Sequence, residues 1–193
     1  MSTTQPIKNK KQLKKFREYY HNVDYKPRNY ALIVLGLNSA LRISDILSLK
    51  WDDVFDGTKY REHIILKEQK TGKEKYVALN QNAVEALELY RHSITDLNLN
   101  AFIFVSQKSP FTRISRSQAF RIVRKAATSC HLDDVEHISC HSLRKTFGYY
   151  AWQMGTPPAL LMSIYNHSSY EITKRYLCID QLEHDRVYQN LSL

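Results

Sequence analysis

The chain has 193 residues, of which 43% are hydrophobic and 24% are charged, with only five Gly and five Pro. This composition excludes a low-complexity or disordered chain and predicts one globular domain with its own core. The 28 Lys and Arg residues outnumber the 19 Asp and Glu residues, so the formal net charge is +9. Such an excess indicates a polyanionic partner, most often a nucleic acid. A basic protein with no nucleic-acid role is the alternative at this point.

Cys130, Cys140 and Cys178 are neither even in number nor spaced as metal-binding pairs. They predict buried free thiols in a reducing compartment rather than disulfides or a zinc site. No leader-like segment opens the chain, and no apolar stretch approaches the roughly 20 residues that span a bilayer. We therefore expect a cytoplasmic protein that does not enter a membrane.

Residues 1–28 form a basic opening arm, with eight Lys or Arg residues against two acidic ones. Such an arm can lie along DNA phosphates, with Lys14 and Lys15 as candidate contacts, or it can remain a solvated terminus. Phe16 and Tyr20 recur at helical spacing, which predicts a helix that packs through one face.

Residues 29–50 are largely apolar and predict a buried helix, a turn near Asn38-Ser39 and a second short helix. Arg42 follows that turn, in surroundings where an unpaired charge would be costly to bury. Asp45 lies three residues further on. It can satisfy Arg42 as a structural pair, or it can hold the arginine in place for an external anion.

A β-hairpin is predicted over residues 63–79, because two strand-like runs flank the turn signal Thr71-Gly72. Its tip carries Lys67, Lys70, Lys73 and Lys75. Lysines at such a tip are most often solvated, but one of them can reach a neighbouring phosphate site as an acid.

Residues 106–125 carry six basic side chains and no acidic one. Ser115 is predicted to cap an amphipathic helix that begins near Arg116 and buries Phe120 and Val123. The outer face of this helix suits phosphate binding. The candidate DNA contacts of the segment are Arg113, Arg116, Arg121 and Arg124, to which Lys73 is added from the hairpin tip.

Residues 141–176 include four side chains of chemical interest at close spacing: His141, Arg144, His167 and Tyr176. His141 and Arg144 are three residues apart on a predicted helix, so they share a face and can address one anion. A further helix is expected to begin at Pro157-Pro158 and to bury Leu160, with His167 in the turn after it. Tyr176 follows nine residues later as an oxygen nucleophile or a stacking ring.

In this order, the residues resemble the signature of the tyrosine recombinase (phage integrase) family. The strings that carry the resemblance are LNSALRISDILSLKWDDV, EQKTGK, HSLRKTF and NHSSYEITKRY. The resemblance covers nearly the whole catalytic domain, and the step from His167 to Tyr176 is its most specific part. The resemblance implies a mainly α-helical catalytic domain over 29–180 with a small antiparallel β-sheet or hairpin at one edge. The arm precedes this domain, and a tail at 181–193 that can be exchanged between protomers follows it.

The resemblance implies a site-specific DNA recombinase that breaks and rejoins duplex DNA through a 3′-phosphotyrosyl intermediate. Tyr176 would attack the scissile phosphate, while Arg42 and Arg144 would bind its non-bridging oxygens. His141 would act as acid/base near the nucleophile, and His167 would donate a hydrogen bond to a phosphate oxygen.

The resemblance also assigns the supporting residues and the partners. Lys70 best matches the lysine that protonates the leaving 5′-oxygen, with Lys67 and Lys73 left open, and Asp45 matches the acid that supports the first arginine. Neither a metal nor a nucleotide cofactor is implied. The implied partners are duplex DNA, further copies of the chain in a tetramer on DNA, and an accessory DNA-bending protein, with no membrane.

Two departures from the family pattern keep alternatives open. Asn166 stands where the family usually has Gly before the second histidine, and only about 28 residues precede the catalytic domain. The chain is therefore expected to be a small invertase-like member or a fragment of a longer integrase, encoded by a bacterium, phage or mobile element. A catalytically silent DNA-binding regulator and a type IB topoisomerase-like enzyme that relaxes DNA remain the alternatives.

Overall fold

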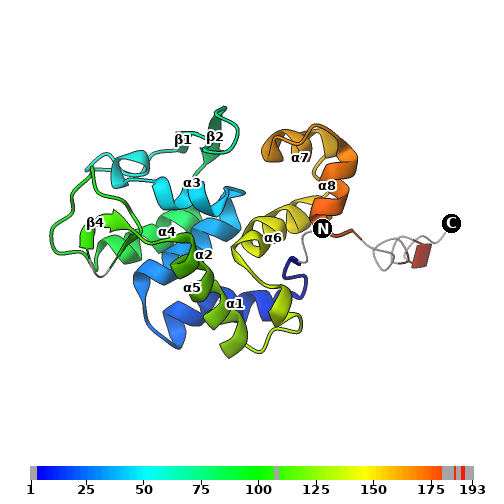
Figure 1. The fold of residues 1–193 in the computed structure, drawn as a ribbon, viewed down its shortest axis with the longest axis horizontal. Helices are drawn as coiled ribbons and strands as arrows, with labels where there is room; N and C mark the ends of the chain where they lie inside the picture. Colours follow the sequence, from blue (N-terminus) through cyan, green and yellow to red (C-terminus); the bar gives the residue numbers. More distant parts are fainter. Residues whose placement is uncertain (1–3, 107–108, 180–184, 186–187, 190–193) are drawn as a thin grey trace.

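A computed structural model of the chain describes residues 4–106, 109–179, 185, 188 and 189, and is mainly helical (Figure 1). Its helices are α1 (Lys10–Asn22), α2 (Pro27–Ser39), α3 (Ile43–Ser48), α4 (Gln81–Arg91), α5 (Arg116–Ser129), α6 (Cys140–Gln153), α7 (Pro158–Tyr165) and α8 (Tyr170–Leu177). Its strands are β1 (His63–Lys67), β2 (Glu74–Ala78), β3 (Val105–Ser106) and β4 (Ser109–Arg113). The predicted class, mainly α with a small antiparallel sheet at one edge, is confirmed. None of the described helices is long and apolar enough to cross a membrane.

Helix α2 is the centre of the fold and packs against α1, α4 and α6. Its residues from Ala31 to Leu35 are each at most 1% exposed. A helix that is apolar on every side must be covered on every side, so the apolar run of the sequence explains this central position. Ala40 ends the helix in the left-handed conformation, with φ at 52°.

Helix α1 is part of this packed core. Phe16, Tyr19 and Tyr20 are buried, and the Tyr20 hydroxyl donates to the carbonyl of Ile122 in α5 at 3.0 Å. The predicted packing of one helical face is therefore confirmed. The division of the chain at residue 28 stays a prediction.

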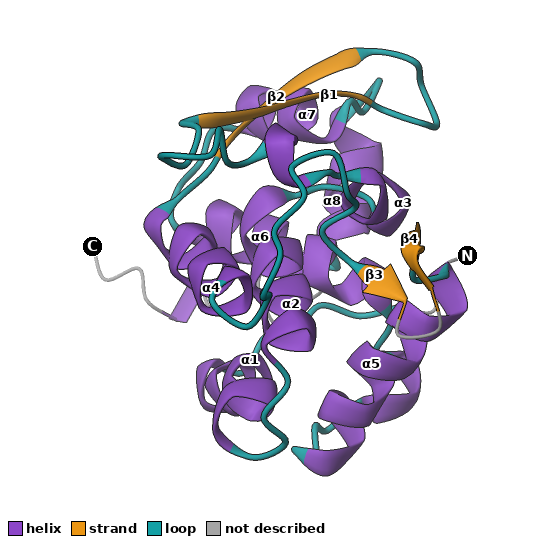
Figure 2. Ribbon diagram, turned by 90° about the vertical axis from the view of Figure 1, so that its left-hand side faces the viewer, coloured by secondary structure: helices purple, strands orange, loops and turns teal. Residues whose placement is uncertain are grey.

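The hairpin of β1 and β2 lies at one end of the molecule, and α1 lies at the other (Figures 1 and 2). The strands are antiparallel with Ile64 opposite Val77, and both of these side chains are buried. The turn between them includes Gly72 at φ 67°. The predicted hairpin is confirmed, whereas β3 and β4 form a separate two-stranded sheet.

Helices α7 and α8 form a small unit, here called the α7–α8 unit, that packs on α6. The rest of the described fold, from α1 to α6 with both sheets, is called the body. The core between them consists of Ala40, Leu161, Tyr165 and Leu177. Gly148 of α6 permits this close packing, because a Cβ there would lie 2.1 Å from the Tyr165 hydroxyl. Any side chain at position 148 would therefore push the unit away.

Three predictions about burial need correction. Phe120 is 43% exposed and Leu160 is 51% exposed, because Ala119 and Leu161, the neighbouring residues in each helix, face the core instead. The cysteines are free thiols but only partly buried. The tail expected at 181–193 falls largely outside the described residues.

Candidate active site

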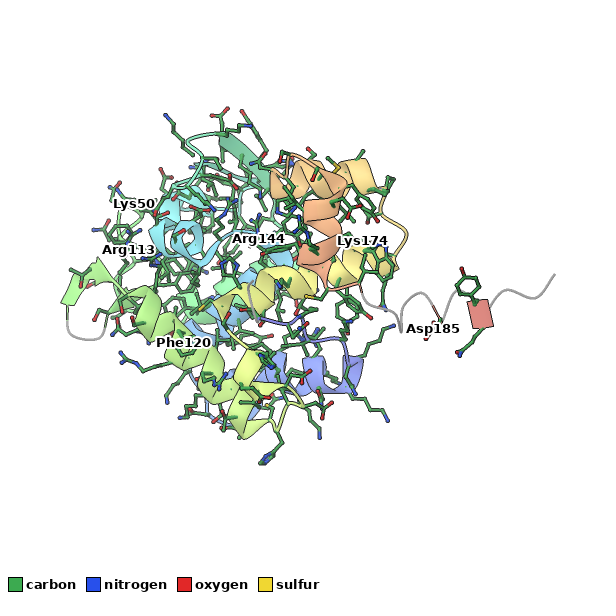
Figure 3. The ribbon with its side chains drawn as sticks, turned by 45° about the vertical axis from the view of Figure 1, so that its right-hand side comes forward. Lys50, Arg113, Phe120, Arg144, Lys174 and Asp185 are labelled. Atoms are coloured by element: carbon green, nitrogen blue, oxygen red, sulfur yellow. The ribbon has the colours of Figure 1, made fainter. Side chains whose placement is uncertain are left out.

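A cleft of about 350 Å³ opens where α3, the hairpin turn, α5 and α6 approach one another. Among the residues that line it are four of the predicted catalytic residues and one predicted DNA contact: Arg42, Lys70, His141, Arg144 and Arg116. Arg144 lies near the middle of the molecule, between Arg113 on one side and Lys174 of α8 on the other (Figure 3). The cleft therefore collects positive charge from segments that are far apart in the sequence.

Arg144 is fixed by backbone carbonyl groups. It is 2% exposed, and its guanidinium donates to the carbonyl of Ala40 and, at 3.2 Å, to that of Tyr165. Its guanidinium carbon lies 4.7 Å from the centre of the Tyr165 ring and 5.9 Å from that of Tyr176. Carbonyl dipoles orient the guanidinium without neutralising it, so its charge stays available to an anion.

Arg42 is held instead by a carboxylate. Its guanidinium lies 2.7 Å from an oxygen of Glu68, whose side chain is fully buried. Burial raises the pKa of Glu68, but hydrogen bonds from Thr71, Asn166 and Arg42 outweigh it and lower the pKa to about 2. Glu68 is therefore an anion at neutral pH, and it neutralises part of the charge of Arg42.

The expected pair between Arg42 and Asp45 is wrong. Arg42 is the N-cap of α3 and has an extended backbone, so the helical three-residue spacing does not bring the two side chains together. Asp45 is fully buried and accepts the backbone amide of Gln69 at 3.0 Å. Its other oxygen, Oδ2, has no hydrogen-bond partner among the described residues. Asp45 thus contacts the hairpin beside Lys70.

Tyr176 is not among the residues that line the cleft, but it contacts His141, which lines it. Its hydroxyl lies 3.4 Å from His141 Nδ1, and the two rings meet edge-on. Desolvation raises the pKa of Tyr176, although Arg144 opposes this shift. Desolvation by neighbouring atoms, followed by the charge of Arg144, lowers the pKa of His141, which still keeps an exposed edge. At neutral pH the Tyr176 phenol is therefore protonated and the His141 imidazole is neutral, so the phenol can donate its proton to the imidazole.

His167 lies in the turn between α7 and α8, as predicted. Its Nδ1 is 3.0 Å from the Thr173 hydroxyl, and its ring stacks on Tyr165 at 5.2 Å between centres. The edge of Tyr176 lies at the same centre-to-centre distance. Burial, reinforced by Arg144, lowers the pKa of His167 to about 4. The ring is thus neutral at pH 7 and is fixed from three sides.

Asn166, at the position where the family usually has Gly, adopts a left-handed backbone conformation that suits Gly. Its φ of 54° and ψ of 42° are left-handed, which Asn tolerates better than most residues. Its side chain also makes a contact that Gly cannot make, because Nδ2 donates to Glu68 Oε2 at 3.0 Å.

The hairpin lysines separate into two kinds. Lys70 is exposed and lines the cleft, whereas Lys67 and Lys73 are exposed but are not among the residues that line it. Lys75 is buried, donates to the carbonyl of Ile164 at 2.8 Å, and lies 3.7 Å from Glu68. Burial, followed by the charge of Arg144, lowers its pKa to about 8. Lys75 therefore does not belong to a solvated tip, and Lys70 remains the best-placed candidate acid.

The predicted DNA contacts also differ in placement. Those with exposed side chains are Lys14, Lys15, Lys73, Arg113, Arg116 and Arg121. Lys14 and Lys15 belong to α1, at the opposite end of the molecule from the hairpin (Figure 1). Arg124 is half-buried, and its guanidinium donates to the carbonyls of Val135 and Ile138. It is therefore not part of the outward basic face.

Glu68 and Tyr165 are the site residues that sequence reasoning missed. Tyr165 binds Arg144 twice, since its carbonyl accepts from the guanidinium and its hydroxyl donates to the Arg144 carbonyl at 2.8 Å. The alternation of Ile64, Leu66 and Glu68 could have identified Glu68, because it continues the inward-facing positions of β1 to the residue that directly follows the strand. Within the described residues, no group of three or more His, Cys, Asp and Glu gathers in a way that could hold a metal.

Known proteins resemble the chain in sequence and in fold. The phage integrase family profile matches residues 8–183. The chain is 40% identical over 183 residues to the probable integrase/recombinase YoeC of Bacillus subtilis (strain 168), covering 94% of this chain and 93% of YoeC. It is 27% identical over 156 residues to tyrosine recombinase XerC of Pelobacter propionicus, covering 79% of this chain and 48% of XerC, so it spans about half of that relative. In structure it is similar to the XerA recombinase, with a TM-score of 0.77, 20% identity and coverage of 98% of this chain and 67% of XerA.

Proposed function

The chain belongs to the phage integrase family, and from this we propose that it is a site-specific DNA recombinase that cuts and rejoins duplex DNA at the cleft. The observation that carries the proposal is the placement of Tyr176, whose hydroxyl lies 3.4 Å from His141 Nδ1 and whose ring centre lies 5.9 Å from the guanidinium carbon of Arg144. A phenol, a neutral imidazole and a buried cation at one point suit attack on a phosphodiester.

In the proposed reaction, the Tyr176 oxygen attacks the scissile phosphorus. A P–O bond forms to the tyrosine while the bond to the 5′-oxygen breaks, leaving a 3′-phosphotyrosyl link and a free 5′-hydroxyl. The phenol proton passes to the neutral imidazole of His141. One phosphodiester is exchanged for another, so rejoining is the same step in reverse.

The two arginines neutralise the charge that develops on the phosphate. Arg144, whose carbonyl partners leave its charge uncompensated, would bind one non-bridging oxygen, and Arg42 would bind the other. His167 is neutral at pH 7 and would donate a hydrogen bond without adding charge. Positioned donors of this kind typically contribute about 10²–10³ in rate each.

Lys70 would protonate the leaving 5′-oxygen, because among the hairpin lysines it is the one that lines the cleft. Asp45 would support it indirectly, since its carboxylate holds the amide of the neighbouring residue Gln69. In this role Asp45 acts on the hairpin rather than on Arg42.

Duplex DNA is the proposed partner. Arg116 at the cleft and the exposed Arg113 and Arg121 would bind its phosphates, and Lys73 would do so from the hairpin, whereas Lys14 and Lys15 would require DNA that reaches α1. We further propose assembly as a tetramer on DNA, with 29–180 as the catalytic domain and the tail at 181–193 exchanged between protomers.

The test is covalent capture on a nicked duplex taken from the DNA that flanks the gene. Cleavage next to the nick releases a short fragment, so the phosphotyrosyl adduct cannot be resealed and accumulates. We expect an adduct with the unmodified protein, none with Tyr176→Phe, and a normal amount with Tyr170→Phe, a matched change in the same helix.

Other outcomes would assign other functions. Tight DNA binding with no adduct would contradict the proposal and favour a silent regulator. Relaxation of supercoiled DNA without exchange between two sites would favour a topoisomerase-like enzyme.

A further inference from the structure

We propose that Asn166 is a positioning residue that ties the α7–α8 unit to the arginine side of the site through Glu68. The inference rests on the proposed function for its effect on DNA cleavage, whereas the tether itself is a feature of the fold. Asn166 is not among the residues that line the cleft, and it directly precedes His167.

Glu68 is the fixed point of this tether. One of its oxygens binds Arg42 at 2.7 Å, and the other accepts from Thr71 at 2.7 Å and from Asn166 at 3.0 Å. Its side chain is fully buried, so each of these donors replaces a lost water molecule. A buried carboxylate that loses a donor must find another partner or move, and here any movement carries Arg42 with it.

Asn166 can act from only one orientation. Its amide nitrogen must face Glu68, because the amide oxygen would be repelled by the carboxylate. The left-handed backbone of the residue directs the side chain toward Glu68 at the hairpin, while the next residue, His167, stacks on Tyr165. The position of His167 and the position of Arg42 are therefore linked through one carboxylate.

A second bond spans the same gap. Lys75 of β2 donates to the carbonyl of Ile164, near the end of α7, at 2.8 Å. It also lies 3.7 Å from Glu68. The hairpin thus binds the α7–α8 unit at two neighbouring residues, Ile164 and Asn166. These two bonds set the distance between the hairpin and the turn that carries His167.

The test compares variants in the rate of adduct formation at saturating protein and in the protein concentration for half-saturation of DNA. Asn166→Gly keeps the backbone conformation and removes only the side chain. We expect it to lower the rate about tenfold, the size expected for a hydrogen bond to a charged group. Half-saturation should change less than about twofold, because the fully buried Glu68 does not face solvent.

A swap of donor and acceptor separates positioning from general damage. Asn166→Asp places two carboxylates together and should lower the rate further, and Glu68→Gln should also lower it. The double variant Glu68→Gln with Asn166→Asp restores a hydrogen bond and the net charge, so it should be faster than either single variant. Asn100→Gly, an exposed asparagine in the turn after α4, is the matched control and should leave the rate unchanged.

Backbone amide exchange provides a readout that does not depend on activity. In Asn166→Gly we expect exchange at Gln69 to Gly72 and at His167 to rise about tenfold, with α2 unchanged. Unchanged rate and exchange in Asn166→Gly would overturn the inference, as would a loss confined to DNA binding. If the unmodified protein forms no adduct on any duplex, the proposed function fails, and the exchange comparison alone decides for or against the tether.

Discussion

The body and the α7–α8 unit contribute to one site but rest on very different amounts of core. The body is held together by two large buried clusters that run through α2, α4, α5 and α6. The unit adds Leu161, Tyr165 and Leu177 and packs on Ala40. Arg42, Arg144 and His141 belong to the body, whereas His167 and Tyr176 belong to the unit.

This difference teaches that the proposed nucleophile is carried by the less firmly anchored part. Segments with few buried apolar contacts open locally at a lower free energy than the whole fold. The alignment of Tyr176 with Arg144 therefore depends on a few specific contacts rather than on bulk burial. Substitutions at those contacts should affect cleavage more than global stability, and the following experiments test that contrast.

The largest effect is expected for Gly148→Ala. The added Cβ would lie 2.1 Å from the Tyr165 hydroxyl and 2.6 Å from Leu177 Cδ2, so the unit must shift away from α6. A displacement of about 1 Å can cost about 10²-fold in rate, which is the loss we expect in adduct formation. The matched change in the body is Gly36→Ala, whose Cβ would meet Leu143 Cδ1 at 2.6 Å. It should lower the free energy of unfolding in urea by about 1–3 kcal/mol with a much smaller change in rate.

Acid should weaken the unit before it weakens the body. The pKa of His167 is lowered to about 4 in the folded protein, against an ordinary value near 6.5, so the unfolded chain binds the proton more tightly. The stabilisation is complete above about pH 6.5 and is lost as the pH falls toward 4. After allowance for solvent screening, we expect a loss of about 1 kcal/mol in unfolding free energy between pH 7 and pH 4.5.

Urea unfolding of the unmodified protein and of His167→Asn at both pH values measures this loss. The pH dependence should be smaller in the variant. Equal pH dependence in the two proteins would show that His167 is not responsible. The pH range of the comparison stops at 4.5, which is the ordinary pKa of a Glu side chain. Below that pH the unfolding free energy would also fall because of Glu68, whose pKa is lowered to about 2 in the folded protein.

A pair of tyrosine hydroxyls tests the contrast more finely. Tyr165→Phe removes the bond to the Arg144 carbonyl at 2.8 Å, and Tyr20→Phe removes the bond to the Ile122 carbonyl at 3.0 Å in the body. Each should cost about 1 kcal/mol of unfolding free energy. Only Tyr165→Phe should also slow adduct formation, by about fivefold. Similar rates for the two variants would remove the distinction between unit and body.

The smallest effects are expected on the surface of α5. Arg121 is exposed, so Arg121→Gln should weaken DNA binding and reduce the slope of log affinity against log salt by about 1. Arg124 donates to the carbonyls of Val135 and Ile138, so Arg124→Gln should lower thermal stability and leave the slope unchanged. Binding titrations at several salt concentrations and thermal unfolding separate the two. A reduced slope for Arg124→Gln would return it to the DNA-facing set.

Much of the fold could be predicted from local patterns. The apolar run of α2, the Thr71-Gly72 turn and the caps at Asn80 and Ser115 each determine an element through contacts within a few residues. The errors at Phe120 and Leu160 are errors of helical phase. A shift of one residue moves a side chain by about 100° around a helix, and only tertiary packing decides between neighbours.

The site could be predicted only in part, for a similar reason. The family resemblance predicted Arg42, Lys70, His141 and Arg144 as members of one site, and these four residues line one cleft. The partner of Arg42 was not predictable from spacing, because it lies on a hairpin 26 positions away. The three-residue spacing favoured Asp45 instead, but Arg42 precedes the helix as its cap, so this spacing does not bring the two side chains together.

The left-handed backbone of Ala40 sets stability and activity against each other. A φ of 52° costs an alanine roughly 1 kcal/mol relative to glycine, and the carbonyl of this residue holds the guanidinium of Arg144. Glycine at this position would remove that cost, but it would also delete a buried methyl group from the core between the body and the unit and let the peptide turn more freely. The exchange would therefore relieve backbone strain at the expense of core packing and of the position of Arg144. An engineer who seeks a hardier enzyme should look for stabilising changes elsewhere in the body.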